Sequence, residues 1–302
     1  GRSMRDMQQA VNKINLAGTL MDVTFGEGKL SDGRPYQRAT VTVRVTQTYG
    51  GHEESSDIQR SMFATEFTST GKPNPAWRSI NDLKLMKTDQ NVGIDAASHV
   101  RCTGDSLQEN NFVSRNGQLI NGWQIRGSFI NEARVADVAS FVTDIYIMDM
   151  HDEVNKEGDT TGRLIIKGGI VQYGGRLDVV EFVVEAPDTV EYISRNWEIN
   201  TTINVKGRIR VLSQEEEVQS SGWGEDVPDT TTRFVRELVI TTGDDGPKEE
   251  EFSYDPMEIR KAFAERKAMI EQMQISARQT STKQGAYNIN SAEASSKKYE
   301  WE

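Results

Sequence analysis

Residues 100–104 read VRCTG and residues 203–207 read INVKG, so a similar pattern of residue types occurs twice in the chain. Apolar and polar residues alternate in both stretches and a glycine follows, which is the pattern of a half-buried strand that meets a turn or a bulge. After a polar loop each stretch is followed by a second alternating strand, GWQIR at 122–126 and RFVREL at 233–238. This repetition predicts two similar β-units.

The segments around these strands complete the pattern. The first unit has strand-like stretches at 14–21, 39–46 and 58–68 and helical spacing at 76–87, and the second has strands at 141–150, 163–173 and 176–184 and a short helix after Pro187. Five strands with a helix between the third and the fourth is the plan of the OB-fold barrel. Matching positions lie 103 residues apart at Gly104 and Gly207 but 111 apart at Trp123 and Phe234. Both a diverged duplication and chance similarity between β-rich segments fit this difference.

The expected fold is therefore mainly β: two OB-fold-like five-stranded barrels in tandem, a C-terminal helix and a disordered tail. Pro256 stands where a helix begins, and Ile259, Phe263, Ile270 and Met273 would form its apolar stripe. The tail is rich in Ser, Thr, Gln and Asn, a composition typical of disorder. The predicted divisions are a tag remnant and N-terminal arm (1–11), a first barrel that binds nucleic acid (12–135), an acidic second barrel that is structural or contacts protein (136–245), a linker and helix (246–275), and the tail (276–302).

The net charge of −11 conceals an uneven distribution. Residues 1–135 hold 16 Lys and Arg against 14 Asp and Glu, which gives +2, whereas residues 136–245 hold 10 against 22, which gives −12. The remaining residues contribute −1, from 9 against 10. The first unit can therefore present a basic face to a polyanion, and the second unit is unsuited to one.

Signals for catalysis are weak. The chain has no phosphate-binding glycine loop and no nucleophile elbow, and its one cysteine, Cys102, excludes an intrachain disulfide or a cysteine-rich metal site. Residues 149–153 (DMHDE) form the one compact metal-capable cluster, which we interpret as the charged end of a strand. We expect no enzyme activity, no metal and no cofactor. With no apolar run of membrane-span length, we also expect no membrane partner and a cytoplasmic location, the host cytoplasm if a phage encodes the chain.

Signals for single-strand binding are stronger. OB barrels stack bases on aromatic side chains while basic groups follow the phosphates, and in the first unit the two residue types are interleaved. The loops at 25–36 and 108–122 are the equivalents of the OB-fold loops that bind nucleic acid. The second unit's long loop, 213–231, carries Trp223 among carboxylates that would repel phosphates. The candidate nucleic-acid-binding residues are Lys29, Arg34, Tyr36, Arg38, Arg44, Arg60, Phe63, Trp77, Arg101, Phe112, Arg115, Trp123 and Arg126.

Three short stretches carry a family resemblance: NKINLAGTL at 12–20, VKGRI at 205–209 and NGQ at 116–118. They resemble the first strand, the fourth strand and the following hairpin tip of bacterial and phage single-stranded DNA-binding proteins. The resemblance implies an OB-fold that coats single strands in replication, recombination or repair, with a tail that recruits partner proteins. This chain departs from the family pattern in its tandem unit, which points to a phage-encoded variant. It also ends in YEWE at 299–302 instead of an acidic stretch with Pro-Phe.

These observations leave two main hypotheses. The first is a non-enzymatic, sequence-tolerant single-stranded DNA-binding protein, with RNA as a second possible ligand and homo-oligomers as a possible state. In it Tyr299 and Trp301 dock on replication or recombination proteins. The alternative is a structural β-protein of a phage virion or assembly, which the excess of carboxylates also fits. A hydrolase that uses the cluster around His151 is a remote third.

Overall fold

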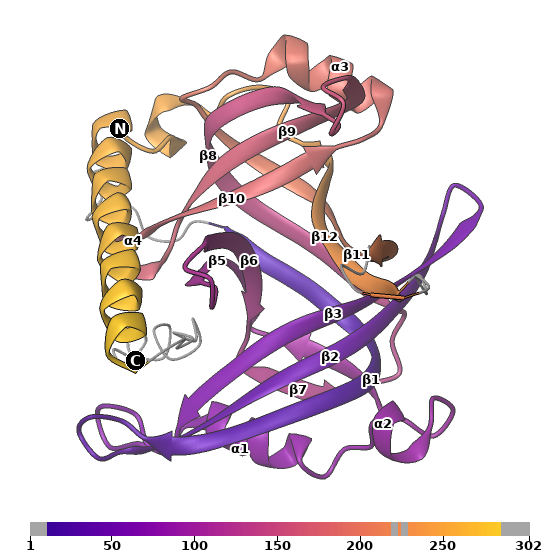
Figure 1. Cartoon of the computed structure of the whole chain (residues 1–302), viewed down its shortest axis with the longest axis vertical. Coiled ribbons are helices and arrows are strands. Elements are labelled where there is room, and N and C mark those ends of the chain that lie inside the picture. The colour runs from indigo at the N-terminus through magenta and orange to yellow at the C-terminus, as the bar shows by residue number, and fades with distance from the viewer. Residues whose placement is uncertain (1–10, 219–222, 225–228, 285–302) are drawn as a thin grey trace.

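The computed structural model describes residues 11–218, 223–224 and 229–284. Two barrels lie one above the other, and a long helix stands beside them (Figure 1). The predicted tail residues Tyr299 and Trp301 lie outside the described residues, as does the N-terminal arm up to residue 10. Within the described residues, no helix is both long and apolar enough to cross a membrane.

The first barrel closes as an OB-fold does. Strand β1 pairs with β2 on one side and with β4 on the other, and the barrel is sealed where β3 meets β6 in parallel at Ser61 and Arg126. The fourth strand of the OB-fold plan is divided into β4 and β5, and the fifth is divided into β6 and β7. The elements are β1 (Asn12–Lys29), β2 (Pro35–Tyr49), β3 (His52–Thr65), α1 (Pro75–Leu83), α2 (Asp89–Val92), β4 (His99–Thr103), β5 (Ser106–Val113), β6 (Leu119–Arg126) and β7 (Phe129–Glu132).

The second barrel repeats this topology. Strand β10 pairs in parallel with β12 at Val183 and Val239, and β11 pairs with both β12 and β8. The same closure confirms two OB-fold barrels in tandem, which chance similarity between β-rich segments would not produce. The elements are β8 (Val138–Val154), β9 (Thr160–Val171), a 3-10 turn (Tyr173–Gly175), β10 (Leu177–Val184), α3 (Pro187–Asn196), β11 (Thr202–Val218) and β12 (Asp229–Gly243).

The two glycines of the repeated stretches, Gly104 and Gly207, are required for different physical reasons. Gly104 has a φ of +74° and lies where the fourth strand breaks between β4 and β5, a conformation that side chains disfavour. Gly207 lies inside β11, where a Cβ atom would be 1.8 Å from the carbonyl oxygen of Val239. One position therefore needs glycine for its backbone and the other needs it for space.

The barrels share one sheet and one core. The start of β1, from Asn12 to Ala17, pairs antiparallel with β8 from Thr143 to Val138, and one cluster of buried apolar side chains extends through both barrels. Strands β11 and β12 form a long hairpin, which we call the β11–β12 arm. Its base also contacts the first barrel, where the Val211 backbone N–H donates to Ser56 Oγ of β3 at 3.0 Å. The division into domains at residues 135 and 136 stays a prediction.

Helix α4 (Pro256–Gln284) begins at the predicted proline, after a short 3-10 turn (Glu250–Phe252). Its first half packs Ile259 and Ala262, with Tyr254 just before it, against the outer side of β8–β10. The helix runs past residue 275, so the predicted start of the disordered tail at 276 is wrong. The predicted stripe also fails at Phe263, which is 37% exposed although the neighbouring Ala262 is 5% exposed, so Phe263 lies on the side of α4 that faces away from the barrel.

Candidate nucleic-acid interface

Alternation along β2 separates a core side from an outer side. Val41, Val43 and Val45 are buried, whereas Tyr36 and Arg38 stand on the outer side and are partly exposed. Register pairs Arg38 with Phe63 of β3, and paired residues of neighbouring strands share a face. Tyr36, Arg38 and Phe63 therefore lie together on the outside of the first barrel, and we call these three residues the platform.

The platform is a small aromatic surface with a cation beside it. The ring centroids of Tyr36 and Phe63 are 5.3 Å apart, and the Arg38 guanidinium carbon is 6.0 Å from the Tyr36 centroid. Register places Gly26 opposite Arg38 and Gly28 opposite Tyr36. A Cβ at Gly28 would lie 2.5 Å from the Tyr36 hydroxyl oxygen, so the missing side chain leaves the space in which the ring rests across β1. Such a surface can stack bases and contact a phosphate.

Replacing Gly28 by alanine is expected to displace the Tyr36 ring with little effect on folding. Gly28 has no positive φ in the structure and its neighbour is the end of a side chain, so alanine fits the backbone. We expect single-strand affinity to fall by about 3- to 10-fold, less than the loss of a whole stacking ring, with the melting temperature almost unchanged. Fluorescence titration and thermal melting of the variant measure both; a large fall in melting temperature would contradict this account of the glycine.

The β5–β6 hairpin extends the outer side of the barrel beyond the platform. Its front is the side that carries Phe112, Gln124 and Arg126, since the register pairs Gln124 with Gln108 and Arg126 with Ser106 on that side. Arg126 is next to β3 through its pairing with Ser61. Arg115 is exposed in the turn of the hairpin. The predicted residues thus follow one another outward from the barrel in the order Arg126, Phe112, Arg115.

Some of the predicted cations are already paired. The Arg44 guanidinium donates to both carboxylate oxygens of Asp57, at 2.8 and 3.0 Å, which raises the pKa of Arg44. In the β1–β2 turn the Asp32 carboxylate accepts from the backbone N–H and the Nε of Arg34, which lowers the pKa of Asp32. Lys29 at the end of β1 is exposed. Because these ion pairs are exposed, they are weak, and each arginine can exchange its carboxylate partner for a phosphate.

Two of the predicted contacts are wrong. Arg60 is fully buried, and its Nη2 lies 2.5 Å from Asp105 Oδ1 inside the first barrel. Trp123 is 6% exposed and belongs to the core cluster, with the Arg236 guanidinium carbon of β12 4.2 Å from the centre of its ring. Arg236 also donates to the Trp123 carbonyl oxygen at 3.1 Å. Trp123 therefore joins the two barrels and has no face left for a base.

The last two predicted residues lie apart from the platform. Trp77 is on α1 and is partly buried against the core. Arg101 is exposed on β4, which lies on the other side of β1 from β2. Gly26 and Gly28 were not among the residues predicted from the sequence. A signal for them was present, because counting back from the turn at 31–33 puts each glycine opposite a bulky platform residue.

The corresponding face of the second barrel is covered. Besides α4, the β5–β6 hairpin packs against β10 and the residue that follows β9: the Glu109 backbone N–H donates to Asp178 Oδ2 of β10 at 3.0 Å, and Gln172 Nε2, just after β9, donates to the Leu107 carbonyl at 2.9 Å. Burial raises the pKa of Asp178, although Arg176 opposes the shift. The chain's own segments thus cover the face of the second barrel that corresponds to the platform.

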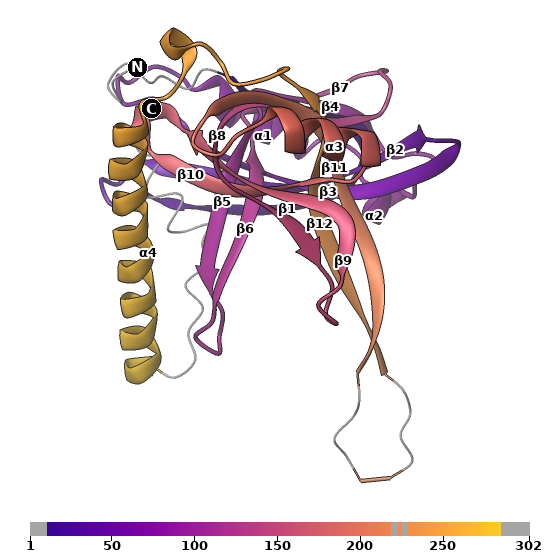
Figure 2. The ribbon, with the colours of Figure 1, turned by 90° about the horizontal axis from the view of Figure 1, so that it is seen from above.

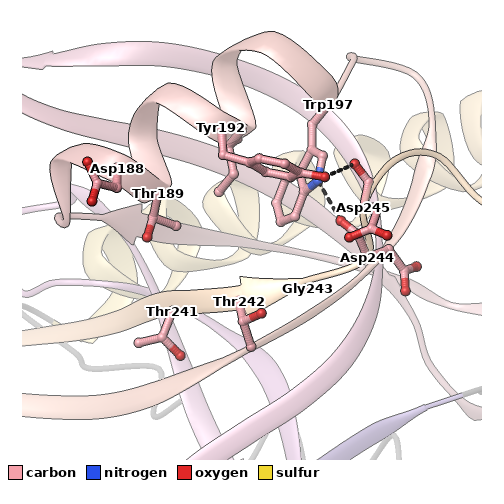
Figure 3. Close-up of a pocket in the computed structure, with 10 residues that line it drawn as sticks. Asp188, Thr189, Tyr192, Trp197, Thr241, Thr242, Gly243, Asp244 and Asp245 are labelled. Atoms are coloured by element: carbon pink, nitrogen blue, oxygen red, sulfur yellow. Dashed lines mark hydrogen bonds between the residues drawn. The ribbon is translucent and has the colours of Figure 1, made fainter.

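A cavity of about 290 Å³ lies between α3 and the end of β12 in the second barrel (Figure 3). Asp188, Asp244 and Asp245 line it, and it contains no Lys or Arg among its lining residues. Tyr192 donates to the Asp245 carbonyl oxygen and Trp197 to that of Asp244, both at 2.9 Å. A phosphate would meet carboxylates here, so the cavity does not suit a polyanion.

The remaining catalytic candidates have structural surroundings. His151 lies on the exposed part of β8, 2.8 Å from the Asp149 carboxylate. In the part of the chain that the structure describes, no group of three or more His, Cys, Asp and Glu residues could hold a metal ion. Burial raises the pKa of the Cys102 thiol to about 12, which keeps it protonated at neutral pH.

The architecture defines a tandem OB-fold protein in which one barrel has an open aromatic–basic face. The chain belongs to the YorF family, whose sequence model matches residues 10–276. No curated protein matches by sequence. Two similar solved structures are the wild-type single-stranded DNA binding protein from Thermus aquaticus and a deletion mutant of that protein. The wild type is 11% identical with a TM-score of 0.49 and covers 79% of this chain and 94% of its own; the mutant is 12% identical with a TM-score of 0.48 and covers 80% and 96%.

Proposed function

We propose that this protein binds single-stranded DNA without sequence preference, through the first barrel and without catalysis. The observation that carries the proposal is the platform, where Tyr36, Phe63 and Arg38 lie together on an open barrel face. Stacking does not depend on base identity because every base has a π-face. Phe112, Arg115 and Arg126 on the hairpin would continue the path of the strand.

The two barrels have different tasks in this proposal. The first unit is nearly neutral and its outer face is open, whereas the second carries most of the negative charge and is covered by α4 and the hairpin. In this proposal the second barrel therefore supports the first structurally, and its negative charge repels the phosphates of a nucleic-acid strand. The protein would act in the cytoplasm during replication, recombination or repair, with the C-terminal tail recruiting partner proteins; RNA binding and homo-oligomers are compatible with this role.

The affinity for an oligo-dT strand is expected to fall with salt. Three to four phosphate contacts, supplied by Arg38, Arg126, Arg115 and Lys29, imply a fall of about 20- to 50-fold between 50 and 200 mM salt, at a slope of about 0.7 per contact. Titration of tryptophan or labelled-oligonucleotide fluorescence at several salt concentrations measures the slope. Absent binding, or an affinity that salt does not change, would refute the proposal. A parallel titration with oligo-U tests the preference for DNA over RNA.

A second candidate is a structural role in an assembly. The β11–β12 arm projects from the molecule (Figure 2), Trp223 on it is fully exposed and Phe234 is 61% exposed. Exposed aromatics on an acidic arm suit a protein contact better than a phosphate contact. Light scattering without nucleic acid distinguishes the two: rings or filaments favour assembly, and small discrete species that bind oligo-dT favour the first candidate.

A further inference from the structure

The β5–β6 hairpin is held from behind. Its front carries Phe112 and Arg126, and its back carries Glu109 and Trp123, because these residues alternate along the two strands. The hairpin projects from the barrel (Figure 2), and Val113 near its end is 3% exposed. A projecting two-stranded hairpin is marginally stable alone, so contacts on its back decide where its front points.

One side chain from α4 supplies the charged part of this hold. Arg266 Nε lies 2.9 and 3.1 Å from the two carboxylate oxygens of Glu109, and its Nη2 also donates to that carboxylate. Glu109 Oε2 accepts a further bond from the Val179 backbone N–H at 3.2 Å. The side chains are 18% and 7% exposed for Arg266 and Glu109. A shielded pair with this fork geometry is stronger than a surface ion pair.

The other charged groups at this place do not replace Arg266. Asp178 of β10 accepts from the Glu109 backbone N–H, and its carboxylate is paired with Arg176, whose Nε is 3.0 Å from Asp178 Oδ1. Two carboxylates thus meet here, and each has its own arginine. Without Arg266, the Glu109 carboxylate would face Asp178 with its charge uncompensated, and the base of the hairpin would be repelled from the second barrel.

We propose that Arg266 is a positioning residue for single-strand binding: by holding Glu109 it fixes the β5–β6 hairpin so that Phe112 and Arg115 lie over the strand bound at the platform. This inference rests on the proposed function. Helix α4 is suited to the task because Ile259 and Ala262 anchor it to the second barrel. The helix connects that barrel to the β5–β6 hairpin of the first.

The test compares three full-length variants. Arg266→Met removes the charge and keeps much of the length, Arg266→Lys keeps the charge but not the fork, and Lys267→Met removes the neighbouring exposed charge as a control. Hydrogen exchange over residues 110–122 reports hairpin mobility, and oligo-dT titration reports affinity. We expect Arg266→Met to speed exchange in the hairpin and to lower affinity about tenfold, equivalent to about 1.4 kcal/mol. For Arg266→Lys we expect an exchange rate and an affinity between those of Arg266→Met and those of the unaltered chain. For Lys267→Met we expect both to equal those of the unaltered chain.

The outcomes separate this inference from the proposed function. An unaltered chain that does not bind oligo-dT overturns both, whereas binding that Arg266→Met leaves unchanged overturns only the inference. Faster exchange over the whole chain would assign Arg266 a general structural role and overturn it too. The slope of affinity against salt should stay as in the unaltered chain, because a positioning residue touches no phosphate; a slope reduced by about one contact would make Arg266 a direct ligand and overturn the inference.

Discussion

Replacing Arg60 by methionine while Asp105 stays in place is expected to destabilise the protein by about 3–5 kcal/mol, enough to unfold a marginal domain. Arg60 Nη2 bonds the Asp105 carboxylate at 2.5 Å and the carbonyl oxygens of Thr103 and Phe129 at 3.1 and 2.7 Å. The substitution leaves a buried carboxylate and two carbonyl groups without their donor. Urea unfolding followed by circular dichroism measures the loss.

The matched control removes both charges. The double variant Arg60→Met, Asp105→Leu should recover most of the lost stability, because a buried pair replaced by apolar groups costs little. If the double variant is as unstable as the single one, the site needs the shape of the arginine, and the electrostatic explanation is wrong. Space is limited there: a Cβ added at Gly127 would lie 1.9 Å from Asp105 Oδ1.

The effect of pH on the single variant follows from the pKa of Asp105. Burial raises that pKa above its ordinary value, and Arg60 opposes the shift, so the loss of Arg60 raises it further. A carboxyl group whose pKa is raised in the folded state destabilises the protein when it is ionised. This destabilisation disappears as the pH falls through the folded pKa and the group takes up a proton. The gap in stability between Arg60→Met and the unaltered chain should therefore narrow toward acid pH. A gap that widens would contradict this assignment.

The fold was accessible from the sequence because its signals are local. Alternation marks the strands, glycine and proline mark their ends, and the same order occurs twice, so the two barrels follow from the OB-fold plan. The length of α4 was not accessible, since residues 276–284 have the composition of a disordered tail. Their helical state continues that of residues already fixed by Ile259 and Ala262 on the second barrel, and helix propagation costs less than nucleation.

The candidate face was predicted only in part, because composition does not say on which side of a strand a residue lies. Arg60 is two residues from both Ile58 and Met62, so it shares their side of β3, and this pattern would have placed it inside the barrel. Trp123 shares a side of β6 with the buried Ile125 in the same way, and its ring is also covered by Arg236 from the other barrel. That contact spans 113 residues, and no pattern within one strand contains it. Tyr36, Arg38 and Phe63 were named from two separate segments, and only the β2–β3 register of the structure places them on one face. Their role in binding stays a prediction.

Replacing Tyr36 and Phe63 together by alanine is expected to lower the affinity for oligo-dT by at least about 30-fold, equivalent to about 2 kcal/mol. Each ring can stack one base, and stacking contributes about 1–3 kcal/mol per base. The rings are 5.3 Å apart and share some of their contact area, so the double loss should be smaller than the sum of the two single losses. Both side chains are partly exposed, so the fold should survive the change.

Two further variants decide whether the rings act by stacking. Tyr36→Phe keeps the π-face and should bind almost as the unaltered chain does, whereas Tyr192→Ala removes an aromatic that is 44% exposed on the acidic barrel and should change nothing. Salt supplies an independent criterion: the aromatic double variant should lose affinity at every salt concentration without a change of slope, since the rings release no counterions. Arg38→Met should do the reverse and flatten the slope by about one contact. If the double alanine variant binds normally while Arg38→Met weakens binding, the strand is held by its phosphates alone and the platform is not a stacking surface.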